Sequence, residues 1–183
     1  MQKKVYGGND LYKNDNDGKL AVIAVIFAMI IFTLVSCSKE IRELRGGTQD
    51  IAWRIYERAG IDARNMEETP LSAMDSYMLG LDEEDFRENV EKACVYRPSL
   101  LSAEQSLCVV LAKSEECAED IFEEMAENYE WAPCDPSRSA VFMQYGKYVL
   151  LGKDSASGTG VLAEAFGKET SGGAKTEFSQ NPM

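Results

Sequence analysis

Histidine is absent from this chain of 183 residues. Its absence excludes Ser-His and Cys-His nucleophile pairs, and it removes the imidazole groups that most often bind metals in proteins. Beyond Cys37 the cysteines are widely spaced, so none forms the C-x-x-C pair of a zinc site: Cys94, Cys108, Cys117 and Cys134. The sequence therefore predicts no catalytic residue, no metal site and no cofactor, and we expect a protein that is not an enzyme.

Basic residues are scarce as well. The chain has 19 Lys and Arg against 31 Asp and Glu, which gives a formal net charge of -12 at pH 7. A domain of this charge repels phosphate backbones and anionic lipid head groups. We therefore expect no nucleic-acid partner.

Long apolar runs are limited to one stretch, Leu20 to Val35, which contains no charged residue. Residues 1–19 before it are polar and carry four lysines. An apolar segment after a positively charged region is typical of an export signal. With the residues that follow, the run also reaches the lower limit of about 17 for a spanning helix. Residues 20–37 are thus either a signal or a transmembrane segment.

The apolar run ends in Leu34-Val35-Ser36-Cys37, which resembles the lipobox of bacterial lipoproteins. The resemblance implies that Cys37 is lipidated, and that cleavage before it makes it the mature N-terminus. The alternative is an uncleaved single-pass anchor. Both interpretations attach the protein to the cell membrane, with residues 38–47 as a tether and the C-terminal domain on the extracytoplasmic face.

An α+β domain is predicted over residues 48–166. Helix signals indicate a helix from Thr48, as its cap, to Ala59, a short one over 71–79, and another after Asp82. The clearest helix follows Ser114, where one apolar stripe repeats at helical spacing: Ala118, Ile121, Phe122, Met125, Ala126 and Tyr129.

Four strands complete the predicted domain. They are residues 92–97, 106–112, 139–144 and 147–153, the last two forming a hairpin around Tyr145 and Gly146. We expect a mainly antiparallel four-stranded sheet with the Ser114 helix on one face. Residues 62–70 are predicted to be a polar connection, residues 155–160 (SASGTG) a Gly-rich loop able to hold an anion or simply flexible, and residues 167–183 a disordered tail.

The order of these elements resembles an uncharacterised bacterial family, the domain of unknown function numbered 4358. The resemblance lies in YMLGLDEEDFRENVEKACVYRP, SLCVVLAKSEECAEDIFEEM and AVFMQYGKYVLLGKD, within residues 48–166. An LYGID-like turn precedes a short acidic helix and a strand, and a second strand leads through a KD-like turn into an amphipathic helix. A hairpin around GKYV follows. The resemblance implies a Firmicutes protein with a lipoprotein-type signal, and it implies no activity.

Several functions remain open. We expect a non-catalytic binding or interaction module with a protein partner; the alternatives are an enzyme that uses carboxylates or a thiol, and an accessory subunit of a membrane complex. Cys94 and Cys108 are predicted to be buried thiols, or a disulfide between neighbouring strands. Phe142, Tyr145 and Tyr148 on the hairpin are either an aromatic patch for a partner or, in part, core residues.

Overall fold

The computed structural model describes residues 44–98, 105–132 and 135–182, all of which belong to one compact unit, Ile41–Met183. The domain is α+β, as predicted, but its antiparallel sheet has six strands instead of four, in the order β1-β2-β3-β5-β4-β6. The strands are β1 (Glu67–Pro70), β2 (Val90–Arg97), β3 (Ser106–Ala112), β4 (Ser139–Tyr145), β5 (Tyr148–Asp154) and β6 (Lys175–Gln180). The four predicted strands are β2 to β5, and β3 lies inside the sheet.

Both additional strands lie at the edges of the sheet. β1 occupies the segment predicted to be a polar connection, and β6 occupies part of the predicted disordered tail. Their side chains are almost all exposed, so neither strand shows the apolar alternation that reveals a strand in a sequence. Backbone pairing with β2 and β4 holds them in place. Pro70 fits at such an edge, where a missing N–H group interrupts no ladder.

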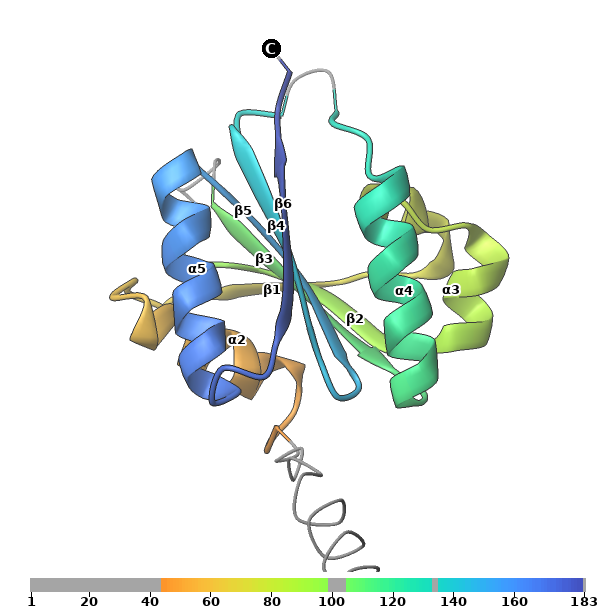
Figure 1. Cartoon of the computed structure of the whole chain (residues 1–183), viewed down its shortest axis with the longest axis horizontal. Coiled ribbons are helices and arrows are strands. Elements are labelled where there is room, and N and C mark those ends of the chain that lie inside the picture. Colours follow the sequence, from red (N-terminus) through yellow and green to blue (C-terminus); the bar gives the residue numbers. More distant parts are fainter. Residues whose placement is uncertain (1–43, 99–104, 133–134, 183) are drawn as a thin grey trace, which may run out of the picture. The chain divides into compact units, whose positions relative to one another are not determined.

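Helices cover both faces of the sheet, whereas the sequence predicted a helix on one face only (Figure 1). α2 (Thr48–Arg58) and α5 (Ala156–Glu169) pack on one face. α4 (Glu115–Asn128), α3 (Glu83–Asn89) and the 3₁₀ helix η1 (Ala73–Leu79) pack on the other. The predicted stripe of α4 is confirmed, because Ala118, Ile121, Phe122 and Met125 are buried.

The sheet thus separates two apolar cores, and this separation decides the state of two cysteines. Cys94 pairs with Val109, and Cys108 pairs with Val95, so the two thiols are offset by one residue. Side chains one residue out of register point to opposite faces of a sheet. Cys94 accordingly belongs to the core under α2 and α5, Cys108 to the core under α4, and both are free thiols. The predicted burial is confirmed, and the alternative disulfide is wrong.

Two helix starts differ from the sequence prediction. Gly47, not Thr48, is the N-cap of α2, and the buried Thr48 hydroxyl accepts a hydrogen bond of 2.7 Å from the Tyr96 hydroxyl. The predicted SASGTG loop is instead the first turns of α5, capped by Ser155, whose hydroxyl accepts from the Gly158 amide at 3.1 Å. A Cβ at Gly158 would lie 2.2 Å from the Asp154 carboxylate carbon. That carboxylate already occupies the helix start, so an anion site there is wrong.

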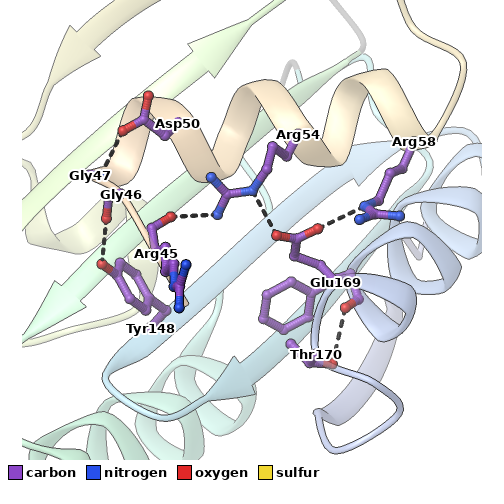
Figure 2. A network of polar contacts seen from close by, with 10 residues as sticks. Arg45, Gly46, Gly47, Asp50, Arg54, Arg58, Tyr148, Glu169 and Thr170 are labelled. Atoms are coloured by element: carbon purple, nitrogen blue, oxygen red, sulfur yellow. Dashed lines mark hydrogen bonds and ion pairs between the residues drawn. The ribbon is translucent and has the colours of Figure 1, made fainter. Parts of the chain in front are cut away.

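The predicted tether is bonded to the domain over its last residues (Figure 2). Glu169, near the end of α5, accepts hydrogen bonds from Arg54 at 2.6 Å and from Arg58 at 2.7 Å, and its side chain is only 12% exposed. Arg54 also donates to the backbone carbonyl of Arg45 at 2.7 Å. Arg54 and Arg58 are partly exposed, so each ion pair contributes only about 0–1 kcal/mol to stability, and their main effect is to fix geometry. Arg54 therefore links the incoming chain to α2 and α5 at once.

Two further hydrogen bonds hold the glycines that follow Arg45. The Tyr148 hydroxyl of β5 donates to the Gly46 carbonyl at 3.0 Å, and the Gly47 amide donates to the Asp50 carboxylate at 2.9 Å (Figure 2). A Gly-Gly pair would otherwise be a flexible joint. Residues 45–47 are consequently part of the domain.

The apolar run of residues 20–35 and Cys37 lie outside the described residues. Within the part of the chain that the structure describes, no helix combines the length and hydropathy that crossing a bilayer requires.

Candidate functional site

A pocket of about 530 Å³ opens on the face of the sheet that α4 covers. Its walls come from the end of η1 and the turn into α3, from the last turns of α4 and the residues after it, and from Lys153 of β5. Pockets that bind small molecules or side chains in proteins have volumes of about 300–1,000 Å³. We refer to this cavity as the η1–α4 pocket.

Three aromatic residues line the η1–α4 pocket, Tyr77, Tyr129 and Trp131, and we refer to them as the aromatic wall. The Tyr129 ring meets the Trp131 ring edge to face, with centroids 5.4 Å apart and planes at 79°. On its other side Tyr129 meets Phe142 of β4 in the same way, at 5.5 Å. Phe142 is itself buried in the core. Through Tyr129, the Trp131 ring is therefore packed against the core of the sheet.

Gly80 lets η1 approach the end of α4 closely enough to form this pocket. It has a φ of +76°, in the left-handed region that favours glycine. A Cβ at this position would lie 2.8 Å from the backbone nitrogen of Tyr129 and 2.9 Å from the carbonyl carbon of Asn128. Any side chain here would force the end of α4, with Tyr129, away from η1.

Three acids also line the pocket, Asp82, Glu124 and Glu130, and we refer to them as the acidic rim. Glu124 of α4 accepts a hydrogen bond of 3.1 Å from the Asp82 backbone amide, which joins α4 to the start of α3. Partial burial raises the pKa of Glu124, and the neighbouring charges of Asp85 and Asp82 raise it further. Its carboxylate is therefore held in surroundings that already have an excess of negative charge.

Asp82, Asp85 and Glu124 also place one carboxylate oxygen each within 4.8 Å of the others. Ca²⁺ takes six to eight oxygen ligands and Mg²⁺ takes six in near-octahedral geometry. Three carboxylates in an exposed or half-buried setting would supply only part of such a shell. The cluster is better described as a concentration of negative charge than as a metal centre.

A buried ion pair closes the end of the pocket. The Asp135 side chain is 6% exposed, and its carboxylate accepts a hydrogen bond of 2.7 Å from Lys153. It also accepts from the Ser137 amide at 2.9 Å. Burial alone would raise the pKa of Asp135, but the hydrogen bonds from Lys153 and Ser137 outweigh it and lower that pKa. The positive charge of Lys153 is thus balanced by the negative charge of Asp135.

Neither Cys94 nor Cys108 is an activated nucleophile. Burial, followed by a hydrogen bond to Glu68 at 3.1 Å, raises the pKa of Cys94. Burial raises the pKa of Cys108 to about 12. A thiol needs a lowered pKa to be a nucleophile at neutral pH, so these two cysteines are structural. Cys117 is half-buried beside the Ser114 hydroxyl, and Cys134, like Cys37, lies outside the described residues.

Of the site residues predicted from the sequence, Cys37 is outside the described residues, and the hairpin patch is wrong. Phe142 and Tyr145 are buried, and Tyr148 is half-buried with its hydroxyl bonded to Gly46. The η1–α4 pocket was missed. The only signal for it in the sequence is the Trp131 that follows an acidic helix, and its meaning depends on η1, which lies about 50 residues earlier.

Comparison of the chain with protein-family models, with curated proteins and with solved structures finds no match.

Proposed function

We propose that this protein is a membrane-tethered, extracytoplasmic binding module, and that the η1–α4 pocket is its recognition site. The observation that supports this best is the composition of the pocket. The aromatic wall and the acidic rim line the same cavity, and the one lysine of the lining is paired with Asp135. Such walls provide contact area and orientation for a ligand.

Tethering is proposed from the sequence, through the lipobox-like end of the apolar run and lipidation of Cys37. The hydrogen bonds at residues 45–47 are consistent with this proposal. They connect the chain that leaves the membrane segment to both α2 and α5. A domain held in this way is suited to presenting a binding surface near the membrane, alone or as an accessory subunit of a membrane complex.

A carboxylate-dependent enzyme is the second candidate, and one observation favours it. Glu124 has a raised pKa, it lies in a pocket, and Asp82 and Asp85 are beside it, which is the pattern of a general acid. However, Asp82 is exposed and Asp85 is only half-buried. Catalytic carboxylate pairs are more enclosed than this, so binding is the better-supported function.

Site-specific crosslinking in native membranes tests the proposal. A photo-crosslinking amino acid in place of Tyr77, which is 72% exposed and lines the pocket, should capture a partner. The same amino acid in place of Val161, which is 42% exposed on α5 at the other face of the sheet, should not. Equal capture from both positions, or capture from Val161 alone, would show that the recognition site is elsewhere.

A further inference from the structure

The charge of the η1–α4 pocket is unbalanced. Four acids and one lysine line it, and the ion pair between Asp135 and Lys153 leaves the three carboxylates of the acidic rim. In the part of the chain that the structure describes, no lysine or arginine forms a salt bridge with any of these three. Asp85, outside the lining, adds a fourth carboxylate with an oxygen within 4.8 Å of Glu124 and Asp82. The pocket therefore favours a positively charged ligand.

The aromatic wall favours an organic cation over a metal ion. A Tyr or Trp face attracts an ammonium or guanidinium group, and it also covers the apolar stem that carries the group. It offers no ligand to a hard metal ion, which prefers carboxylate, carbonyl and water oxygens. An organic cation on an apolar stem uses both the aromatic wall and the acidic rim, whereas a bare metal ion uses only the acidic rim.

An apolar shelf extends from the pocket along η1. It consists of Met74, Tyr77 and Met78, which are 77%, 72% and 37% exposed. In a 3₁₀ helix residues three apart lie one above the other, so Met74 and Tyr77 share one side. Exposed methionines and aromatic residues beside a pocket are typical of protein recognition surfaces, because they adapt to a partner's apolar side chains.

From these features we infer that the η1–α4 pocket binds an arginine or lysine side chain of a partner protein. The stem of that side chain lies on the aromatic wall, its charged end faces the acidic rim, and an apolar neighbour in the same segment covers the apolar shelf. This inference rests on the proposed function and specifies its ligand.

Fluorine NMR of the full chain tests it directly, because the protein has only two tryptophans. Trp131 lines the pocket, and Trp53 is on α2, 44% exposed, at the other face of the sheet. Labelling with fluorotryptophan therefore gives one reporter and one internal control. The chain is held in nanodiscs of neutral phosphatidylcholine, so that lipid charge does not bind the probe, and the Trp131→Phe variant assigns the two signals.

The probe is a pentapeptide with a central arginine between two leucines, and its control has citrulline, the neutral analogue, at the centre. The arginine peptide should shift the Trp131 signal saturably and leave the Trp53 signal unmoved. The citrulline peptide should bind at least about tenfold more weakly, the loss expected for one charge-assisted hydrogen bond. Glu124→Gln should weaken binding of the arginine peptide by a similar factor. Glu123→Gln, an exposed neighbour on α4 outside the pocket lining, should have no effect.

Three results would overturn the inference. The first is equal affinity for the arginine and citrulline peptides, and the second is no Trp131 shift at millimolar arginine peptide. The third is a Trp131 shift by spermidine at lower concentration than by the peptide, which would assign the pocket to a small organic cation. If the crosslinker at position 77 captures a partner and one of these results is found, only the inferred ligand is refuted. If the crosslinker at position 77 captures nothing, the proposed function itself is refuted.

Discussion

Replacing Gly80 by alanine is expected to destabilise the domain more than the same change at Gly60. The two glycines have almost the same conformation, with φ of +76° and +75°. An L-residue in this left-handed region costs roughly 1–2 kcal/mol, and this cost is common to both variants. The difference between them lies in the space around the new methyl group.

At Gly60 no atom lies within 4 Å of an added Cβ, whereas at Gly80 the Cβ would lie 2.8 Å from the Tyr129 backbone nitrogen. Backbone at the end of α4 cannot rotate away as a side chain can. Overpacking of this kind costs about 1–3 kcal/mol. We therefore expect Gly60→Ala to lower the free energy of unfolding by about 1–2 kcal/mol. Gly80→Ala should lower it by about 2–5 kcal/mol, the sum of the two effects.

Urea denaturation of the full chain in detergent, followed by tryptophan fluorescence, measures both values. Both tryptophans, Trp53 and Trp131, lie in the domain, so the signal reports its unfolding. The slope of the transition should be the same in the two variants if only the native state is affected. Free energies that agree within about 0.5 kcal/mol would refute the close approach of η1 to α4.

Other changes test the core, the acidic rim and the anchor. Phe122→Ala should lower the free energy of unfolding by about 3–5 kcal/mol, because Phe122 is buried between α4 and the sheet; an unchanged denaturation midpoint would contradict this. Glu124→Gln should stabilise the domain at pH 7 and leave it unchanged near pH 3.5. The raised pKa of Glu124 means that the folded state disfavours its charged form. This penalty on folding stability is absent below the ordinary glutamate pKa of about 4.3, and it grows as the pH rises from there through the pKa of the folded state. An equal change in the free energy of unfolding at both pH values would count against a raised pKa of Glu124. Cys37→Ser should abolish acylation and leave Met1 to Ser36 attached, as intact-mass spectrometry of membrane extracts would show; a wild-type mass with those residues and without acyl chains would refute lipidation.

The inner part of the fold could be predicted from the sequence, because local pattern and tertiary environment agree there. β3 is buried on both faces, and its unbroken Val and Leu run is the pattern of an inner strand. α4 has a Ser cap and an apolar stripe, and the cap is confirmed by the hydrogen bond from the Cys117 amide to the Ser114 hydroxyl at 3.1 Å. Each of these signals lies within a dozen or so residues.

The outer parts could not be predicted in this way. β1 and β6 are strands because neighbouring strands offer them hydrogen-bonding partners, not because their own side chains favour burial. The start of α5 contains two glycines and reads as a loop until Asp154 is placed against Gly158. Edge pairing and such close approaches are tertiary properties, and they override local propensity.

The η1–α4 pocket depends on tertiary structure even more strongly. Glu124 and the Asp82 amide that it accepts from are 42 residues apart, and the sequence presents the two acids in separate segments. Each acid by itself is one of 31 in the chain. The close approach of Gly80 to Tyr129, the hydrogen bond from the Asp82 amide to Glu124 and the shared apolar core bring their segments together.

The hydrogen bonds that fix residues 45–47 also shorten the free chain between the domain and the proposed lipid anchor at Cys37. With a lipid on Cys37, eight residues connect the anchor to Arg45, and their fully extended length is roughly 29 Å, whatever conformation they take. The Gly-Gly pair that could act as a swivel is immobilised by Tyr148 and Asp50. If Cys37 carries the proposed lipid, so short a connection would limit the domain to partners whose binding segments lie close to the same membrane, which it would meet by lateral diffusion in two dimensions.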